Sequence, residues 1–577
     1  MRTVRIVALV GAALLAIATA AGTSAASSPK RDPRAIEVQV LAINDFHGNL
    51  APPSGSSGVV NGTPAGGAEY LATHLRNLRA QAAAKKQYTT TVAAGDLIGA
   101  SPLLSAAFHD EPTIEAMNKM GLEVASVGNH EFDEGWRELL RMQKGGCLPD
   151  GDGANNQNSC PDPKAKFRGA KFQYLSANVF NEKSGRTIFP SYEIEKFGST
   201  RVAFIGMTLE DTPNIVTKAG VEGLDFTDEV ETANALVRGL KRKGVESIVV
   251  LLHEGGFPVD ASQFNACPGI SGPIVDIASH LDPEIDAIVT GHTHQGYNCT
   301  LNDPAGKPRL VTSASSFGRL TTEVTLTIDK RSRDVVRTKS SATNRIVTRD
   351  VPKAADLTAL VDKYTTYVAP IQNKVIGATS GTISRTNDDS LESPLGNLIA
   401  DSQKADPSAV TDGKVPEIAF MNPGGIRADL LAAADGSITY GAAFTVQPFN
   451  NYVVSMDLTG AQLATLLEQQ WSGRNGGAPG NWKVLQVSGI TYTWNKDAPE
   501  GSKVVAGSVQ VNGAALDPAR TYRVVVNSFL SDGGDGFAVL AEGTNKFFGG
   551  LDIDSLATYL AAHNPYTPGP TDRIDLP

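Results

Sequence analysis

Short runs of hydrophobic residues recur from about residue 36 to residue 345, and polar turns and helical stretches separate them. Near-continuous apolar runs are typical of strands that are covered on both faces, so this part of the chain predicts a layered α/β domain. Residues 51–66 are rich in Gly, Pro and Ser and predict a mobile loop. Five of these hydrophobic runs lie at residues 38–43, 89–94, 124–127, 248–252 and 285–289.

A different pattern occupies residues 354–374, where apolar side chains recur at helical spacing. This segment follows the last predicted strand of the first domain and precedes a region with a different sequence pattern. We therefore expect a helix that connects two domains. Its buried face is expected to carry Leu357, Leu360, Val361 and Tyr364.

The expected domain boundaries follow from this connector. We expect a first domain at 36–345, a linker with the helix at 346–374 and a second domain at 375–577. An early helix of the second domain should begin at Ser393 and Pro394. Serine is a preferred N-cap residue, and proline is tolerated in the first helical turn.

Residues that bind metals follow most of the apolar runs of the first domain. Carboxylate, amide and imidazole groups together suit a borderline divalent metal, and there are more of them than one tetrahedral ion needs. Ligands that follow parallel strands should meet at one edge of the sheet. Two ions that share a carboxylate are the natural interpretation, and such a pair indicates hydrolysis at phosphorus. The candidate ligands are Asp45, His47, Asp96, Asn129, His253, His292 and His294.

Composition and the N-terminal segment limit the cellular compartments and the binding partners that we expect. A chain of 577 residues should form more than one domain, and a net charge of −10 argues against a nucleic-acid polymer as partner. Residues 1–26 resemble a secretory signal peptide, with cleavage expected near Ala25 and Ala26. An N-terminal membrane anchor is the alternative, but the apolar core is short for a span. We expect an exported protein without a stable membrane anchor, and the oligomeric state is left open.

Four cysteines are present, and export favours disulfides. Three pairings are possible. We favour Cys147–Cys160, which would close a polar insert, and Cys267–Cys299, whose members lie near the histidine segments. A cysteine metal site is disfavoured because no Cys-x-x-Cys spacing occurs.

Ordered sequence blocks in both halves of the chain resemble the 5′-nucleotidase family of calcineurin-like metallophosphatases. In the first half these are Asp45-x-His47, Gly95-Asp96, Gly128-Asn129-His130-Glu131-x-Asp133, a lone His253 and Gly291-His292-x-His294. In the second half they are Leu395-Gly396-Asn397-Leu398, Asn422-Pro423-Gly424-Gly425-Ile426-Arg427, Gln447-Pro448-Phe449-Asn450, Asn527-Ser528-Phe529-Leu530 and Gly533-Gly534-Asp535-Gly536-Phe537.

The resemblance implies a fold and a division of roles. The first domain would have four α/β/β/α layers, and a connecting helix would lead to an α+β nucleotide-binding domain. Two divalent ions are implied, with Zn, Mn or Co expected. One ion would be held by Asp45, His47 and His294, the other by Asn129, His253 and His292, and Asp96 would bridge them. His130 would stabilise charge in the transition state, and Asp133 would orient it.

The resemblance also assigns the substrate side to the second domain. Phe449 and Phe529 would stack on the base, which needs only an aromatic face. Asn422 and Arg427 would contact the substrate, and Asp535 would accept ribose hydroxyls. The sequence departs from the family pattern at two positions, and both concern substrate preference. Only Arg385 is available for a further arginine of the family, and Glu254 follows His253 where family members often have a small residue. The remaining histidines are interpreted as surface or structural: His74, His109, His280 and His563.

The expected activity is hydrolysis of nucleoside 5′-monophosphates to nucleoside and phosphate by attack of a metal-bridging hydroxide. One alternative keeps the site and changes the substrate to 2′,3′-cyclic nucleotides, nucleoside diphosphates or UDP-sugars. Another alternative is a nucleotide-binding surface protein without catalysis. The resemblance further implies that the second domain rotates about the connecting helix during turnover.

Overall fold

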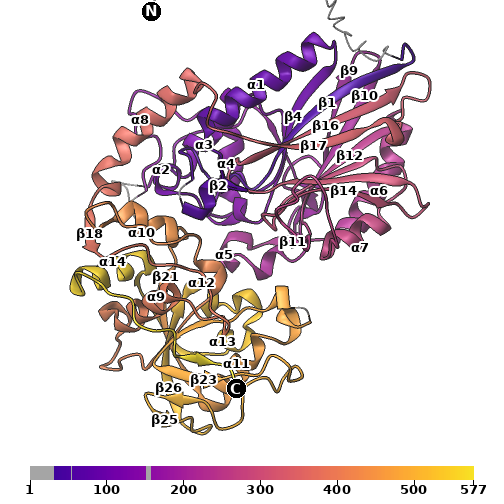
Figure 1. Cartoon of the computed structure of the whole chain (residues 1–577). Helices are drawn as coiled ribbons and strands as arrows, with labels where there is room; N and C mark the ends of the chain where they lie inside the picture. Colours follow the sequence, from indigo (N-terminus) through magenta and orange to yellow (C-terminus); the bar gives the residue numbers. More distant parts are fainter. Residues whose placement is uncertain (1–31, 54, 151–156, 478) are drawn as a thin grey trace, which may run out of the picture.

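The computed structural model describes residues 32–577 except 54, 151–156 and 478. The expected signal peptide lies outside the described residues. Within the described part of the chain, no helix is long and apolar enough to cross a membrane. The described chain forms two domains that lie one above the other, and the first domain is built on two six-stranded sheets (Figure 1).

The first sheet of the N-terminal domain has the strand order β17-β16-β1-β4-β5-β6. Strands β1, β4, β5 and β6 are mutually parallel, whereas β16 pairs antiparallel with β1, and β17 pairs antiparallel with β16. The parallel strands therefore deliver the segments that follow them to one edge of the sheet. The strands are β1 (Ala35–Ile43), β4 (Tyr88–Ala94), β5 (Val124–Ser126), β6 (Gln173–Leu175), β16 (Leu320–Asp329) and β17 (Ser341–Ile346).

The second sheet has the order β14-β15-β13-β12-β10-β9. Its central strands β10, β12, β13 and β15 are parallel, and β9 and β14 are antiparallel strands at the two edges. The strands are β9 (Tyr192–Phe197), β10 (Thr200–Thr208), β12 (Ser247–His253), β13 (Ala287–Thr290), β14 (Gly296–Asn302) and β15 (Pro308–Ala314).

The two sheets pack face to face, and helices cover their outer faces. Val40 and Val92 of the first sheet share a buried cluster with Phe204, Val249 and Leu251 of the second. This double coverage explains why the strand sequences are almost continuously apolar. The expected α/β/β/α architecture is confirmed (Figure 1). The covering helices are α1 (Ala68–Ala84) and α3 (Glu111–Met120) on one side, and α6 (Glu229–Arg242) and α7 (Pro273–His280) on the other.

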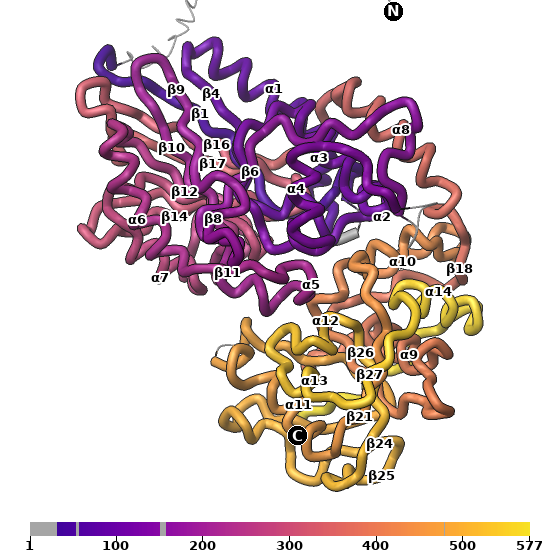
Figure 2. Tube along the Cα trace, turned by 180° about the vertical axis from the view of Figure 1, so that it is seen from behind, coloured from indigo at the N-terminus to yellow at the C-terminus, as the bar shows by residue number. Residues whose placement is uncertain are grey.

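Helix α8 (Ala355–Gln372) connects the domains, as predicted. Leu357, Leu360 and Tyr364 are buried, and Val361 is partly buried against the same core. The helix contacts α2 (Leu103–Ala106) and α3 in the first domain and α10 (Tyr440–Val446) in the second. Figure 2 shows from behind that α8 runs along one side of the molecule between the domains.

The C-terminal domain is built on a mixed sheet with the order β22-β19-β26-β21-β27. Helix α9 (Pro394–Ala405) packs on β19 and β22, and the Ser393 hydroxyl caps it by accepting a hydrogen bond from the Gly396 amide. The predicted start of this helix is therefore confirmed. The strands are β19 (Ile418–Met421), β21 (Tyr452–Thr459), β22 (Gln486–Ser488), β26 (Thr521–Asn527) and β27 (Thr544–Leu551), with α11 (Gly460–Gln469) and α14 (Asp552–Ala562) beside them.

The Gly/Pro/Ser-rich segment 51–66 has more structure than a loop. It contains a two-stranded hairpin of β2 (Val59–Val60) and β3 (Thr63–Pro64). The Arg349 guanidinium donates to the carbonyl oxygens of Pro53, Gly58 and Ala65 at 2.9, 3.2 and 2.6 Å. The sequence could not show this anchor, because Arg349 is almost 300 positions away from the segment.

The cysteines form the two favoured pairs, Cys147–Cys160 and Cys267–Cys299. No free cysteine remains. The first pair closes the polar insert after α4 (Trp136–Lys144), and the second joins the segment before α7 to β14. Both predicted disulfides are confirmed.

Candidate active site

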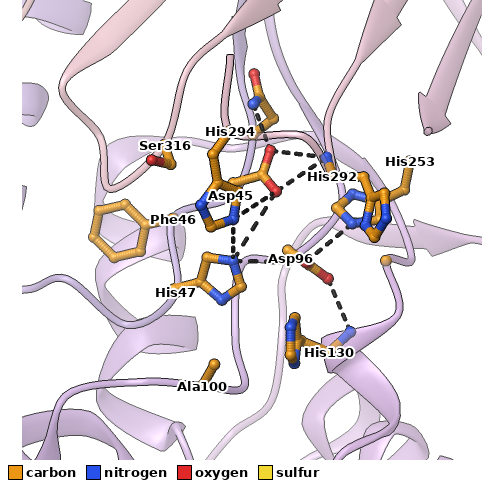
Figure 3. Close-up of polar contacts among 12 residues, drawn as sticks. Asp45, Phe46, His47, Asp96, Ala100, His130, His253, His292, His294 and Ser316 are labelled. Carbon is orange, nitrogen blue, oxygen red and sulfur yellow. Dashed lines mark hydrogen bonds and ion pairs between the residues drawn. The ribbon is translucent and has the colours of Figure 1, made fainter. Parts of the chain in front are cut away.

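One group of donor atoms is formed by Asp45, His47 and His294, whose ligand atoms all lie within 4.8 Å of one another. Asp45 and His47 follow β1 of the first sheet, and His294 follows β13 of the second. The His294 Nε2 lies 3.4 Å from Asp45 Oδ1 and 3.1 Å from His47 Nε2. Residues 247 positions apart thus meet at the edge where both sheets end (Figure 3).

A second group is formed by Asp96, His253 and His292, which meet the same 4.8 Å criterion. The Asn129 amide oxygen lies 3.1 Å from His253 Nε2 and 3.0 Å from His292 Nδ1. Asp96 follows β4, Asn129 follows β5, and His253 ends β12. All seven predicted metal ligands are therefore brought to one place by two sheets.

Asp96 lies between the two groups. Its Oδ2 is 3.0 Å from His253 Nε2 in one group and 3.6 Å from His47 Nε2 in the other. Its Oδ1 accepts a hydrogen bond of 2.9 Å from the backbone amide of His130. This position suits a carboxylate shared by two ions (Figure 3).

Backbone carbonyls orient the histidine rings. His47 Nδ1 lies 2.8 Å from the Gly99 oxygen, and His253 Nδ1 lies 2.7 Å from the Ala94 oxygen. A carbonyl only accepts, so each Nδ1 carries the proton and each Nε2 faces the cluster. This second contact is the usual way in which proteins orient a metal-binding imidazole.

Burial keeps most of these histidines neutral. It lowers the pKa of His47 and of His292 to about 3, and it lowers the pKa of His294 as well. The His47 Nε2 therefore presents a lone pair to His294 Nε2 and to two carboxylates. Converging lone pairs and carboxylates with no proton between them fit a divalent cation.

His253 experiences the opposite shift. Burial lowers its pKa, but the charge of Asp96 and the hydrogen bond to it raise the pKa of His253 to about 10. Burial likewise raises the pKa of Asp45 to about 7. Both pKa shifts have the same physical cause, because the buried carboxylates are stabilised only by positive charge beside them.

The ligand loops adopt strained backbone conformations. Asp45, His47, Asp96, His292 and His294 all have positive φ angles, of 48, 46, 50, 69 and 59°. Such angles are uncommon for residues other than glycine and cluster at functional sites. The surrounding sheets must hold these turns, which supports a functional role for this edge.

His130 and Asp133 lie beside the donor groups. His130 Nδ1 is 2.9 Å from Asp133 Oδ2, which also accepts from the Ala100 amide at 3.1 Å. Burial lowers the pKa of His130, but the charges of Asp133 and Asp96 raise it above the usual value. The His130 ring stacks at 5.7 Å on Phe449 of the second domain.

Both domains line one cavity of about 330 Å³ next to the donor groups. The second domain contributes five of its predicted substrate residues to the cavity wall. The Asn422 amide donates to Asp535 Oδ2 at 2.8 Å, and the Arg427 guanidinium lies 5.7 Å over the Phe449 ring. The predicted residues that line the cavity are Asn129, His130, Asp133, His292, Asn422, Arg427, Phe449, Phe529 and Asp535.

Arg385 and Glu254 do not line this cavity. The Arg385 guanidinium donates to the carbonyl oxygens of Ile426 and Arg427, at 3.0 and 2.9 Å. Its place is therefore behind the Arg427 loop. Glu254 is buried and accepts a hydrogen bond from the Gly255 amide, and burial raises its pKa to about 7. The departure at Glu254 leaves the cavity wall unchanged.

Several residues of the site were not predicted. The buried Glu131 carboxylate accepts hydrogen bonds from the Asp96, Leu97 and Gly128 amides at 2.8, 2.8 and 2.6 Å. It thereby joins two ligand loops. Glu131 could have been singled out from the sequence, because it lies in the same motif as His130. No sequence signal marked the other walls of the cavity, which are formed by Ile215, Val216, Thr217, Phe257, Thr293, Asn451, Arg474 and Lys483.

Comparisons with known proteins agree with this architecture. The family model for calcineurin-like phosphoesterases matches residues 38–296, and that for the 5′-nucleotidase C-terminal domain matches residues 375–542. The chain is similar to the 5′-nucleotidase precursor from Thermus thermophilus, with a TM-score of 0.73 and 28% identity over 94% of this chain and 99% of that one.

Two relatives from bacteria are more similar in sequence but longer. The cell wall protein Lmo0130 of Listeria monocytogenes is 34% identical over 87% of this chain, and the endonuclease YhcR of Bacillus subtilis is 32% identical over 91%. The matched region spans 64% of the first relative and 40% of the second. The two matching family models, in the order in which they occur along the chain, together with a fold shared over almost the whole length, show that the chain belongs to the 5′-nucleotidase family of calcineurin-like phosphoesterases.

Proposed function

We propose that the protein is an exported phosphohydrolase that uses two divalent ions to convert nucleoside 5′-monophosphates to nucleoside and phosphate. One observation carries the proposal. A single cavity has the candidate ligands Asn129 and His292 with His130 on one wall, next to the two donor groups, and two aromatic rings with a carboxylate on the other. The two walls belong to different domains, for which we propose the bounds 36–345 and 375–577.

The donor set suits Zn, Mn or Co, because imidazole nitrogens and carboxylate oxygens are combined. Asp45, His47 and His294 would hold one ion, and Asn129, His253 and His292 the other, with Asp96 shared. Two such ions acidify a water molecule to provide the nucleophile and neutralise phosphoryl oxygens. The carbonyl contacts at Gly99 and Ala94 keep the Nε2 atoms of His47 and His253 directed inward.

His130 is proposed to stabilise the charge that develops on the phosphoryl or leaving oxygen. Asp133 accepts from Nδ1, so Nε2 is the nitrogen that serves the substrate. Its raised pKa favours the protonated ring, which can donate a proton or a hydrogen bond. Arg427 would offer a second positive charge from the other domain.

The nucleoside is proposed to lie between Phe449 and Phe529. Base stacking on aromatic rings is tolerant of base identity. Asp535 would accept ribose hydroxyls, and the Asn527 amide supports Asn422, which in turn holds Asp535. Arg385 would act through the Arg427 loop.

The proposed location rests on the N-terminal segment and on the Listeria relative, which is named as a cell wall protein. The two disulfides fit an oxidising compartment. The proposed partner is a nucleotide, and no polymer of nucleic acid is expected at a net charge of −10.

A phosphate-release panel tests the proposal. Nucleoside monophosphates, nucleoside diphosphates, UDP-sugars and an aryl phosphate are compared with and without chelator, and 2′,3′-cyclic nucleotides are followed by product analysis. Monophosphates should give the highest kcat/KM, chelation should abolish activity, and Mn²⁺, Zn²⁺ or Co²⁺ should restore it. Asp96→Asn should impair both ion sites. Nucleotide binding without metal-dependent hydrolysis would instead indicate a non-catalytic binding protein.

A further inference from the structure

Three cationic side chains line the cavity, all from the second domain: Arg427, Arg474 and Lys483. Arg474 forms an ion pair with Asp211 of the first domain. Arg427 lies over the Phe449 ring. Within the residues that the structure describes, the Lys483 ammonium makes neither a hydrogen bond nor an ion pair. Lys483 is therefore a cation of this wall whose charge is available to a ligand.

The backbone around Lys483 is anchored. Its amide donates to the Gln470 carbonyl oxygen at 3.1 Å, and the Leu485 amide donates to Gln470 Oε1 at 2.7 Å. The preceding Trp482 packs edge-on against Trp494 at 5.5 Å. These contacts hold residue 483 at the cavity, while its half-buried side chain has no partner among the described residues.

The carboxylates of the cavity wall are already engaged. Asp133 accepts from His130 and from the Ala100 amide, and Asp535 accepts from Asn422. An anionic group of the substrate is then the natural counter-charge for Lys483. A charged hydrogen bond in such a partly desolvated site is stronger than a neutral one.

Lys483 and Arg427 line the same cavity as Asn129 and His292, which belong to the candidate metal ligands. Two cations of the second domain therefore share one cavity with the wall at which the phosphate of a nucleotide is proposed to bind.

We infer that Lys483 contacts the phosphate part of the nucleotide in the cavity that it shares with Arg427, and that it makes the enzyme select substrates by negative charge. This inference rests on the proposed function of the same cavity. It predicts that nucleotides with more charge between base and metals depend more strongly on Lys483.

The test compares Lys483→Met and Lys483→Arg on three substrates with one nucleoside: a 5′-diphosphate, a 5′-monophosphate and a monoanionic 5′-aryl diester. Lys483→Met should lower kcat/KM about 10- to 100-fold for the diphosphate, about 3- to 10-fold for the monophosphate and less than about threefold for the diester. Lys483→Arg should stay within about threefold of wild type.

Binding supplies a readout that does not depend on turnover. Calorimetric affinity for a non-hydrolysable α,β-methylene diphosphate should fall about 10- to 100-fold in Lys483→Met, with bound metal unchanged. Lys496→Met, at an exposed lysine of the same domain, is the matched control. Equal losses on all three substrates, or no loss, would overturn the inference.

Failure of the proposed function has a different signature. In that case the wild-type protein would cleave an aryl phosphate but neither bind nor cleave nucleotides. The role of Lys483 is then decided with inorganic phosphate as a competitive inhibitor of aryl phosphate cleavage. Weaker inhibition in Lys483→Met supports a phosphate contact, and unchanged inhibition refutes it.

Discussion

At the scale of single residues, the orientation of each imidazole decides what it can do. His47 and His253 give their Nδ1 protons to carbonyls and present Nε2 inward, as a metal ligand must. The His130 Nδ1 donates a hydrogen bond to Asp133 instead, and His130 lines the cavity that both domains share. Neighbouring histidines of one cluster thus support different chemistry because their hydrogen-bond partners differ.

Replacing His130 tests this division. His130→Asn should keep metal content near the wild-type value and lower kcat by about two to four orders of magnitude, the range of a positioned acid or electrostatic group. Metal analysis and steady-state kinetics are measured on the same preparation, with His280→Asn at an exposed histidine as the control. Loss of bound metal would show that His130 is a ligand.

His109 has a structural role that depends on pH. It is buried, with Nδ1 2.5 Å from Glu134 and Nε2 3.1 Å from Asp150. Burial lowers its pKa, but these carboxylates raise the pKa of His109 to about 9. The folded pKa lies above the unfolded value of about 6.5. Its contribution is therefore complete below about pH 6.5 and is lost as the pH rises through about 9.

The raised pKa of His109 predicts how the stability of the protein changes with pH. The free energy of unfolding of wild type should exceed that of His109→Gln by about 1–2 kcal/mol at pH 6, since the exposed Glu134 limits the gain. The difference should vanish near pH 10. Denaturant unfolding followed by fluorescence gives both values, and a difference that is constant with pH would refute the charged pair.

At the scale of elements, one short turn shapes the proposed base pocket. Phe529 lies in α12 (Ser528–Ser531), and its ring packs on Gly534 in the turn that follows. A Cβ atom at residue 534 would lie 2.4 Å from Phe529 Cζ, so any larger residue must displace the ring. The glycine is thus required by close approach of an aromatic ring.

Gly534→Ala should therefore weaken nucleotide use without damage to the chemistry. KM for a nucleoside monophosphate should rise about 5- to 50-fold, as expected from loss of base stacking. Cleavage of an aryl phosphate should change little. Gly381→Ala, where an added Cβ meets no atom within 4 Å, is the control. Equal losses on both substrates would place the Phe529 ring in the core.

At the scale of the whole molecule, the site exists only where the domains meet. His130 of the first domain stacks on Phe449 of the second, and Asp211 pairs with Arg474 across the same cleft. The N-terminal domain holds the candidate metal ligands, whereas the C-terminal domain holds Phe449 and Phe529. We expect substrate to enter when these contacts open about α8 and to react when they close.

Charge reversal at Asp211 tests the closed arrangement. Asp211→Arg should place like charges across the cleft, raise KM about two- to fivefold and increase the radius of gyration in small-angle scattering, since half-exposed pairs are worth about 0–1 kcal/mol. Asp211→Arg with Arg474→Asp should recover both values. Glu417→Arg, which breaks the Arg520 pair within the second domain, is the control. An unchanged radius in all variants would contradict a closing role.

The sequence by itself determined the local structure and the chemical groups of this protein. Apolar runs located β1, β4, β5, β12 and β13, because strands buried on both faces need apolar residues at nearly every position. Ser393 and Pro394 marked the start of α9 through local capping. The ordered motifs named seven candidate metal ligands, and these seven side chains converge in the structure.

Only the tertiary structure decided which distant groups meet and how they are charged. Arg349 anchors the segment before α1, Glu131 joins two ligand loops, and Lys483 enters the cavity from the other domain. None of these contacts can be recognised from hydrophobic periodicity or motif spacing in the sequence. Each of them depends on backbone groups or a cavity that the folded chain brings together. The hydrogen bonds of Arg385 to the carbonyl oxygens of Ile426 and Arg427 are likewise contacts that only the tertiary structure shows. Local sequence specifies strands, caps and donor types, whereas packing of two sheets and two domains sets distance, burial and pKa.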